Sequence, residues 1–222
     1  MDAKRLVGEK AVEYIKDGMV VGLGMGSTVY YTLLKLGELV KEGLDIKGIP
    51  TSVQTEQLAK ELRIPLLNSS EMEYIDVTID GADEVDPDFA LIKGGGGALL
   101  REKIIANASE QFIVVATREK MVKQLGDFGI PVEVIPFCVE FVKEEMKRIG
   151  LNPVLREQNG HPFKTDNGNY VVDCSVSEPF DPKEMEMELN MIPGVVENGL
   201  FNDMVDIVVS LDDEKNVVVM KR

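Results

Sequence analysis

Residues 76–103, DVTIDGADEVDPDFALIKGGGGALLREK, place a strand, a group of acids, a run of glycines and a helix in direct succession. The apolar, β-branched run from Tyr74 to Ile79 predicts a buried strand that ends at the acids. A second short apolar run leads into Lys93 and four consecutive glycines, and helical spacing begins at Ala98. Ligands of open α/β sheets bind at the ends of strands. This order therefore predicts a site in an α/β fold, with acids and a lysine beside bare backbone N–H groups.

The segments around this stretch alternate between helix and strand. Apolar residues at helical spacing predict helices at residues 3–15, 29–40, 54–62 and 98–108. Short apolar runs predict strands at residues 19–23, 45–50, 64–67, 74–79, 89–92 and 112–116. Strands that are apolar throughout and alternate with helices predict a mostly parallel sheet flanked by helices. Two late apolar runs, 204–211 and 216–220, are expected to return to this sheet.

The pattern changes near Gly126. From there the expected order is strand, helix, strand, strand, helix, strand, with Asp181 as the cap of the second helix and Pro182 at its first position. This is the ferredoxin-like order of elements. The sequence therefore predicts two domains, an α/β domain of residues 1–128 and 202–222 and a smaller ferredoxin-like α+β domain of residues 129–201.

The charge of the chain limits its partners. The 222 residues carry a formal net charge of −15. A nucleic acid would need a basic face, so no such partner is expected, whereas local positive groups can still bind a small anion. The two cysteines, Cys138 and Cys174, form neither a disulfide framework nor a zinc-binding spacing. No leader or membrane-spanning run is recognisable, so we expect a cytoplasmic protein without membrane contact.

The turn at residues 24–28, GMGST, lies between a predicted strand and a predicted helix. This layout directs backbone N–H groups and the helix dipole at an anion, and Ser27 and Thr28 would add hydroxyl donors. The turn lacks the third glycine of a dinucleotide fingerprint. A tight turn without any ligand is the alternative interpretation.

Three acids, Asp80, Asp83 and Glu84, follow the central strand within five positions. Three roles compete for them: metal ligation, acid–base catalysis, and acceptance of hydrogen bonds from a polyol. Lys93 and the glycines favour an anion nearby, because consecutive N–H groups form an anion-binding concavity and a lysine adds a positive charge. We therefore predict that the site holds no metal.

Glu102 lies about one turn into the helix that follows the glycines, between Arg101 and Lys103. From the pattern alone, a surface glutamate is the simpler interpretation. The alternative is a general base that takes a proton from a substrate carbon held over the glycine loop. The N–H groups of the loop would then stabilise the resulting oxyanion. That combination suits proton abstraction next to a carbonyl.

Six segments together resemble the A-type family of ribose-5-phosphate isomerases. In chain order they are GMGST, DGADEVD, KGGGGALLREKI, PVEVIP, TDNGN and IPGVVENGLF, and they extend over nearly the whole chain. The family's fold is an α/β domain with a smaller ferredoxin-like domain. The resemblance implies an aldose–ketose isomerase of the non-oxidative pentose phosphate pathway. It would interconvert ribose 5-phosphate and ribulose 5-phosphate through an enediolate, without a metal or cofactor.

The resemblance also implies roles for individual residues. Glu102 matches the family's base, which moves a proton between C2 and C1 of the sugar. Asp80 and Asp83 match acids that bind sugar hydroxyls and assist ring opening. Lys93 matches the lysine of the loop that binds substrate and stabilises the enediolate oxygen. The further substrate-binding positions that it implies are Met25, Gly26, Ser27, Thr28, Gly81, Ala82, Gly94, Gly95, Gly96 and Lys120.

Met25 departs from the family pattern, because the family usually has threonine at this position of the turn. The change removes a hydroxyl but keeps the backbone N–H. The resemblance further implies a homodimer or a homotetramer. A non-catalytic module of the same fold, which senses a sugar phosphate, is the alternative from another function class. A sensor needs no base, so Glu102 distinguishes the two.

Overall fold

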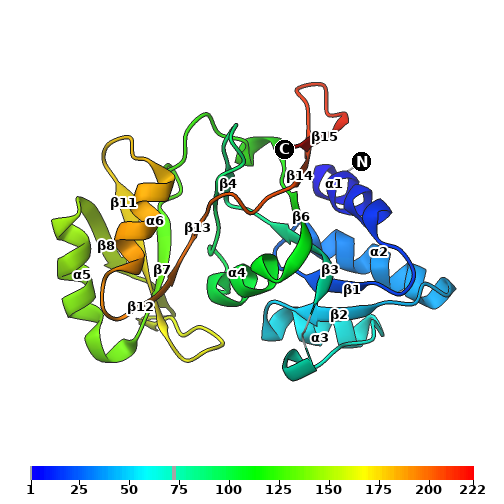
Figure 1. Ribbon diagram of the computed structural model, residues 1–222, viewed down its shortest axis with the longest axis horizontal. Helices are drawn as coiled ribbons and strands as arrows, with labels where there is room; N and C mark the ends of the chain where they lie inside the picture. The colour runs from blue at the N-terminus through cyan, green and yellow to red at the C-terminus, as the bar shows by residue number, and fades with distance from the viewer. Residues whose placement is uncertain (1, 72–73) are drawn as a thin grey trace. The chain divides into compact units, whose positions relative to one another are not determined.

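The structure is a computed structural model that describes residues 2–71 and 74–222. Its contacts group into two compact units (Figure 1). Unit 1 comprises Met1–Ala82, Arg101–Met121 and Met204–Arg222, and unit 2 comprises Asp83–Leu100 and Val122–Asp203. The division of the chain into one domain of residues 1–128 and 202–222 and a second domain of residues 129–201 stays a prediction.

Unit 1 is built on a six-stranded sheet with the order β15-β14-β6-β3-β1-β2. Its strands are β1 (Val20–Leu23), β2 (Lys47–Pro50), β3 (Ile75–Gly81), β6 (Ser109–Val115), β14 (Ile207–Leu211) and β15 (Val217–Lys221). Every neighbouring pair is parallel except β14 with β15, which is antiparallel. The mostly parallel sheet and the return of the two late strands are therefore confirmed.

Helices cover both faces of this sheet. They are α1 (Ala3–Ala11), α2 (Val29–Glu42), α3 (Val53–Glu61) and α4 (Leu99–Asn107). One apolar cluster joins side chains of α1 and α2 to Val21 and Ile79 of the sheet. Successive strand residues face opposite sides, so Gly22 and Thr78 belong to the other face, where Gly22 approaches Ile105 of α4. The short, strongly apolar strands thus belong to a sheet buried on both sides.

The strand order of unit 1 determines where a ligand can bind. β1 has β2 on one side and β3 on the other, so the chain leaves β1 in one direction and returns on the opposite side. In open α/β sheets, the crevice at the carboxyl ends of two such strands is the usual ligand site. The turn after β1 and the end of β3 meet at this point.

Unit 2 contains a four-stranded antiparallel sheet with the order β12-β7-β11-β8. Its strands are β7 (Ile130–Val134), β8 (Leu151–Leu155), β11 (Tyr170–Val176) and β12 (Val195–Asn198). Helices α5 (Val139–Arg148) and α6 (Pro182–Asn190) share one apolar cluster with this sheet. The predicted cap is confirmed, because Asp181 accepts hydrogen bonds from the backbone N–H groups of Lys183 and Glu184. The ferredoxin-like order is confirmed as well.

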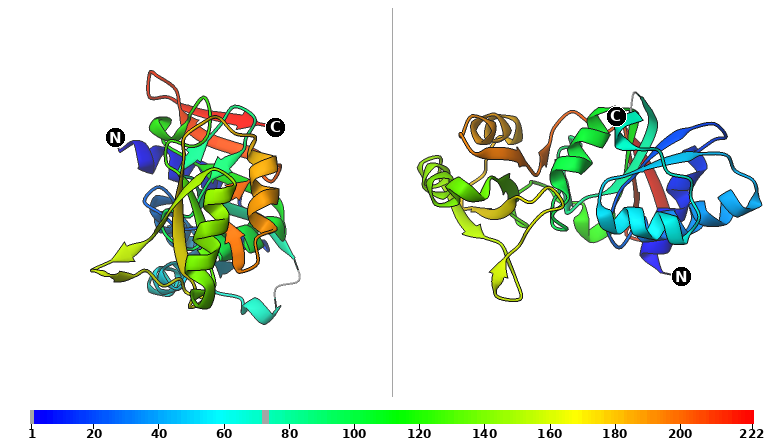
Figure 2. Two further views of the ribbon diagram at one scale, coloured as in Figure 1. Left: turned by 90° about the vertical axis from the view of Figure 1, so that its left-hand side faces the viewer. Right: turned by 90° about the horizontal axis from the view of Figure 1, so that it is seen from below.

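Two smaller pieces complete unit 2. A three-stranded sheet with the order β13-β5-β4 joins β4 (Glu84–Val85), β5 (Leu91–Ile92) and β13 (Leu200–Phe201). A hairpin of β9 (Glu157–Gln158) and β10 (His161–Pro162) extends away from the four-stranded sheet (Figure 2). The loop of residues 165–169 after this hairpin folds around buried Glu133. The Glu133 Oε1 accepts hydrogen bonds from the side chains of Thr165, Asn167 and Asn169, at 2.9, 3.1 and 2.8 Å.

Two predicted elements differ from the structure. Residues 64–67 form a single bridge, between Gly48 and Leu66, instead of a strand. β3 also continues through Asp80 and Gly81, because these residues pair in register with Val114 and Val115 of β6. The first acid of the cluster is therefore part of the sheet and not of a loop beyond it. No helix in the described part of the chain is long and apolar enough to cross a membrane.

Candidate active site

Asp80 lies at the carboxyl end of β3 and is fully buried. Its Oδ1 accepts hydrogen bonds from the backbone N–H groups of Met25 and Gly81, at 3.0 and 2.7 Å. A Cβ at Gly24 would lie 2.2 Å from this oxygen, so only glycine allows the turn after β1 to come this close. These contacts fix the orientation of the carboxylate. The backbone N–H of Met25 therefore orients Asp80, and this role does not need the threonine hydroxyl that the resemblance leads one to expect at position 25.

The turn after β1 borders a cavity of about 560 Å³ within unit 1. Gly26 and Ser27 line it together with residues of α2 and α3. Gly26 has a φ of +110°, a conformation that favours glycine. Lys4 also lines the cavity, and the sequence did not indicate it, because the first helix was recognised only by its apolar spacing. The cavity therefore combines a glycine turn, a hydroxyl and a cation.

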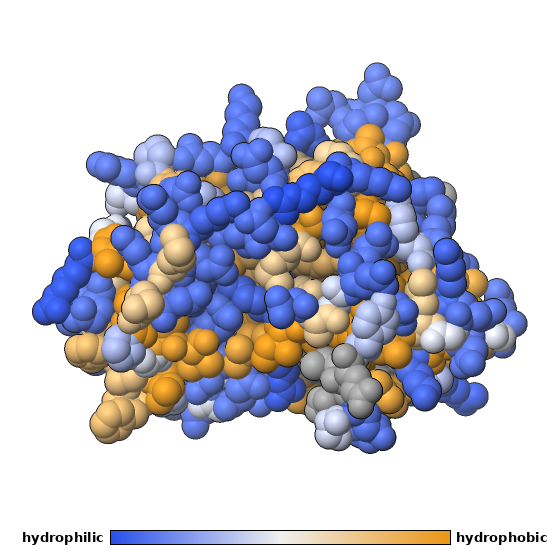
Figure 3. All heavy atoms as spheres, in the orientation of Figure 1, coloured by the Kyte–Doolittle hydropathy of each residue, from blue (hydrophilic) through white to orange (hydrophobic). Residues whose placement is uncertain are grey.

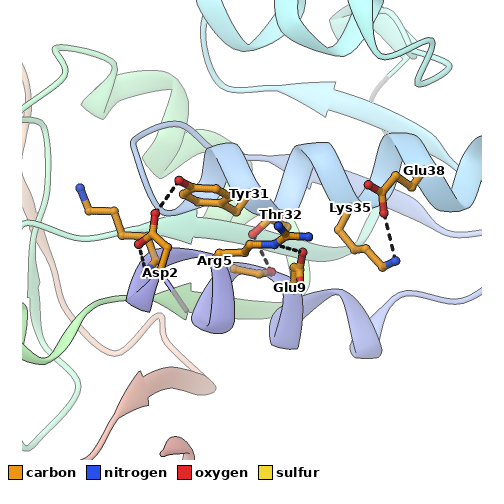
Figure 4. A network of polar contacts seen from close by, with 9 residues as sticks. Asp2, Arg5, Glu9, Tyr31, Thr32, Lys35 and Glu38 are labelled. Carbon is orange, nitrogen blue, oxygen red and sulfur yellow. Dashed lines mark hydrogen bonds and ion pairs between the residues drawn. The ribbon is translucent and has the colours of Figure 1, made fainter. Parts of the chain in front are cut away.

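Contacts between α1 and α2 place Lys4 at this cavity. The Tyr31 hydroxyl donates to Asp2 Oδ2 at 2.6 Å, and the Thr32 hydroxyl donates to the Gly8 carbonyl at 2.9 Å (Figure 4). The hydrogen bond to Asp2 raises the pKa of Tyr31. Asp2 is also the cap of α1, since its side chain accepts from the Lys4 N–H at 3.1 Å. The start of α1 is thus tied to the second helix.

Lys120 ends the short 3₁₀ helix Arg118–Lys120 that follows β6. Its neighbour Glu119 has a lowered pKa, mainly because the Thr117 side chain donates a hydrogen bond to it. The positive charges of Lys120 and Lys4 lower this pKa further. Both lysines therefore lie near Glu119. They provide positive charge at the edge of the sheet where the strands β1, β3 and β6 end.

Glu102 lies in the first turn of α4, the helix that directly follows the glycine loop. Only 4% of its surface is exposed, whereas Ile104 of the same helix is about half exposed. The interpretation of Glu102 as a surface glutamate is therefore wrong. A carboxylate is buried at a position where hydropathy alone predicts an exposed side chain.

Asp83 and the glycine loop belong to unit 2. The Asp83 Oδ2 accepts a hydrogen bond from the Gly95 N–H at 2.8 Å, and the Asp83 N–H donates to the Ile92 carbonyl at 2.8 Å. Gly94 has a φ of +103° and Gly97 a φ of +78°, where other residues are strained. The acid and the loop are thus held against each other.

Lys93 is buried at the start of this loop, with 2% of its surface exposed. Its N–H donates to the Gly199 carbonyl at 2.8 Å, and its Nζ lies 5.5 Å from the centroid of the Phe201 ring. A Cβ at Gly199 would lie 2.2 Å from the Lys93 carbonyl oxygen. Gly199 and Phe201, at the end of the segment IPGVVENGLF, therefore hold Lys93 although they lie about a hundred residues later in the sequence.

Glu84, the third acid of the cluster, has a structural position. It is buried, and its carboxylate accepts from the N–H groups of Gly126 and Phe128 at 2.7 and 2.5 Å. Glu84 thus anchors the loop before β7. Among residues 2–71 and 74–222, no group of three or more His, Cys, Asp or Glu side chains is arranged to hold a metal ion.

The predicted site residues fall into two groups, one in each unit. In unit 1, Asp80 contacts Met25 and Gly81, Gly26 and Ser27 line the cavity with Lys4, and Lys120 lies in the short helix after β6. In unit 2, Asp83 contacts the glycine loop that begins at Lys93. Buried acids at strand ends, cations at a glycine turn and a buried lysine at a glycine loop define an α/β enzyme that acts on a small anionic molecule.

Comparison with known proteins identifies the family. The model of the family "Ribose 5-phosphate isomerase A (phosphoriboisomerase A)" matches residues 47–215. Ribose-5-phosphate isomerase A of Listeria monocytogenes is 49% identical over 224 residues, with 100% of both chains covered. The corresponding protein of Bacillus mycoides is 49% identical over 205 residues, which cover 92% of this chain and 93% of that protein. The chain belongs to the ribose 5-phosphate isomerase A family.

Solved structures agree with this assignment. A D-ribose-5-phosphate isomerase in complex with phospho-erythronic acid has a TM-score of 0.96 and 42% identity, with 100% of both chains covered. Ribose 5-phosphate isomerase A of Methanocaldococcus jannaschii has a TM-score of 0.94 and 41% identity, covering 100% of this chain and 99% of that one. The fold expected from the resemblance is therefore confirmed.

Proposed function

We propose that the chain interconverts D-ribose 5-phosphate and D-ribulose 5-phosphate through an enediolate, with Glu102 as the proton-transferring base. The burial of Glu102 in the first turn of α4, immediately after the glycine loop, carries this proposal. A carboxylate at a helix N-terminus is held by the helix dipole. The full-length match to isomerases gives no support to a sensor without chemistry.

The reaction needs a proton to leave C2 and another to arrive at C1. Glu102 takes the C2 proton, a double bond forms between C1 and C2, and the electron pair of the carbonyl bond moves onto the oxygen at C1, giving an enediolate. The buried Lys93 ammonium and the N–H groups of Gly94 and Gly96 stabilise this oxygen, while the Gly95 N–H holds Asp83. Protonated Glu102 then delivers a proton to C1, the proton of the C2 hydroxyl moves to the oxygen at C1, and a carbonyl forms at C2.

Two further acids handle the sugar. Asp80 and Asp83 accept hydrogen bonds from sugar hydroxyls and assist ring opening by moving a proton between the ring oxygen and the anomeric hydroxyl. Only Gly81 and Ala82 separate them in the chain. The backbone bonds that orient Asp80 and the Gly95 bond of Asp83 support this assignment.

The phosphate requires positive charge and N–H donors away from the reacting carbons. The turn of Met25, Gly26, Ser27 and Thr28 provides donors, and Lys120 provides charge. Lys4 adds a second cation, because it lines the same cavity as Gly26 and Ser27. These groups keep the phosphate fixed while the reacting end changes its charge distribution.

The function is tested by assaying the purified chain after dialysis against a chelator. We expect ribose 5-phosphate to be converted to ribulose 5-phosphate at an undiminished rate, because every proposed role belongs to a side chain or a backbone N–H. Conversion is followed by proton NMR, with undialysed protein as the control. Binding of ribose 5-phosphate without conversion would instead identify a sensor, and activity restored by one divalent ion would identify a metal enzyme.

We also propose that the chain acts as a cytoplasmic enzyme. Cys138 and Cys174 are both free thiols, and Cys174 is buried. Burial raises the pKa of the Cys174 thiol to about 12, which keeps it protonated and unreactive. Free thiols suit a reducing compartment.

A second copy of the chain is the proposed partner, giving a homodimer or a homotetramer. Unit 2 exposes large apolar side chains, including Phe137 at 96% and Met191 at 81%, and apolar surface gathers on its lower part in Figure 3. Their two segments adjoin, because the Ile135 N–H donates to the Gly194 carbonyl at 3.0 Å. Exposed apolar clusters of this kind mark interaction surfaces.

We expect the double change Phe137→Asp and Phe141→Asp to convert the assembly to monomers. The reason is that burying a charge in an apolar contact is costly. Light scattering coupled to size-exclusion chromatography measures the mass. Val154→Asp, at another exposed apolar position of unit 2, is the control. A monomeric natural chain, or a double variant with the natural mass, contradicts the proposal.

A further inference from the structure

Arg156 follows β8 and reaches the glycine loop from a distant part of the chain. Its Nη1 donates to the carbonyl oxygens of Gly94 and Gly95, at 2.9 and 3.1 Å. Its Nε donates to Asp173 Oδ2 at 2.8 Å, and its Nη2 donates to Asp173 Oδ1. The Arg156 side chain is only 15% exposed. All three guanidinium nitrogens are therefore bound, which fixes the plane of the group.

These contacts set the direction of the loop's N–H groups. In a trans peptide, the C=O and the N–H of the same unit point in opposite directions. The Gly94 carbonyl shares its unit with the Gly95 N–H, and the Gly95 carbonyl shares its unit with the Gly96 N–H. Holding both carbonyls on Arg156 therefore turns both N–H groups away from it. The Gly95 N–H accordingly donates to Asp83 on the opposite side.

The end of the loop is restrained by the same segment. The Arg156 guanidinium carbon lies 5.7 Å from the centroid of the Phe163 ring. A Cβ at Gly97 would lie 2.3 Å from Phe163 Cε1, so the ring packs directly on the loop backbone. The Phe163 N–H also donates to the Arg156 carbonyl at 2.8 Å. Arg156 and Phe163 thus form one support, on which residues 94–97 rest.

A run of glycines has the greatest backbone freedom of any sequence, and an oxyanion site is effective only when its donors are already oriented. We propose that Arg156, held by Asp173, is a positioning residue for isomerisation, which keeps the Gly95 N–H on Asp83 and orients the Gly96 N–H toward the developing enediolate. This inference rests on the proposed role of the glycine loop. It assigns a function to a residue that acts through the backbone of the loop.

Arg156→Met tests the inference, because methionine fills part of the space without donating. Removing one oxyanion donor typically costs about 10²–10³-fold in kcat. Here the donors stay but lose their orientation, so we expect kcat for ribose 5-phosphate to fall about 10- to 100-fold. KM should change less than about threefold, because the phosphate is bound by other groups. Arg156→Lys should restore little, since an ammonium cannot bridge two carbonyls and a carboxylate in one plane.

Arg148→Met is the matched control. Arg148 lies on α5 of the same unit and pairs with Glu145 at 2.5 Å, so the change removes an arginine–glutamate ion pair at the surface and should leave kcat unchanged. Guanidinium ion added to Arg156→Ala should raise its kcat, because the ion can occupy the vacated position. A purely structural role predicts no such rescue.

A folded Arg156→Met protein with natural kcat overturns the inference, and so does a loss equal to the unfolded fraction measured by circular dichroism. Should this variant not fold, Asp173→Asn replaces it. This change keeps the side-chain shape but weakens the hydrogen bonds to the guanidinium. A natural kcat in Asp173→Asn would also contradict the inference. Absence of turnover in the natural chain would instead disprove the proposed function.

Discussion

Glu102→Gln lowers kcat for ribose 5-phosphate by about 10²–10⁴-fold, the usual contribution of a general base, and leaves substrate binding largely intact. Glutamine has the shape of glutamate and fits the same buried position, but its amide cannot accept a proton from carbon. Steady-state kinetics measure the loss of turnover, and calorimetric titration with ribose 5-phosphate measures binding. The separation of the two effects is what distinguishes a base from a binding group.

Glu56→Gln is the control for this change. Glu56 also lies in the first turn of a helix of unit 1, α3, but its side chain is partly exposed and pairs with Lys60. Its replacement should leave both kcat and affinity unchanged. A loss of less than about tenfold in Glu102→Gln would exclude Glu102 as the base.

Lys93→Met is expected to reduce kcat/KM by about 10²–10³-fold, the range for removing one stabilising donor from an oxyanion site. Methionine keeps an unbranched chain of similar length, so the backbone bond to Gly199 can persist and the side chain can still pack near Phe201, without the contact between the ammonium and the ring. The ammonium is lost, and with it the positive charge beside the enediolate oxygen. Because this charge also attracts the anionic substrate, KM should rise while kcat falls.

Lys143→Met provides the comparison for Lys93. Lys143 lies on α5 of the same unit, has a mostly covered side chain, and pairs with Glu140 at 3.2 Å. Kinetics measured on both variants separate a local effect from a general loss of positive charge. Natural kinetics in Lys93→Met would show that the glycine N–H groups suffice without the lysine.

The arrangement around Asp80 follows from the sequence because it depends on periodicity and strand direction. Apolar runs separated by helices predict parallel strands, and parallel strands end at one edge of a sheet. The turn at Gly24 and the acid after residue 79 must then be neighbours. The prediction of a strand at residues 64–67 is wrong, because a short apolar segment that has no partner on its outer side forms only one bridge.

The environments of Glu102 and Arg156 could not be predicted in this way. Arg101, Glu102 and Lys103 are consecutive, and the apolar side chains of α4 form no single stripe that would show that Glu102 and Lys103 are both buried. Arg156 and Gly94 are in contact although they are 62 residues apart in the sequence. No local pattern marks an arginine that will bind backbone carbonyls. Glu102 was assigned from a family resemblance, and Arg156 came only from the structure.

The most direct test of the account is isomerisation in deuterium oxide, followed by proton NMR for the natural chain and for Glu102→Gln. In the natural chain we expect ribulose 5-phosphate to form with some deuterium at C1, because a base that holds the proton can exchange it with solvent. In Glu102→Gln, product formation and deuterium uptake should slow together by about 10²–10⁴-fold. Product formation and deuterium uptake at natural rates in Glu102→Gln would contradict the account.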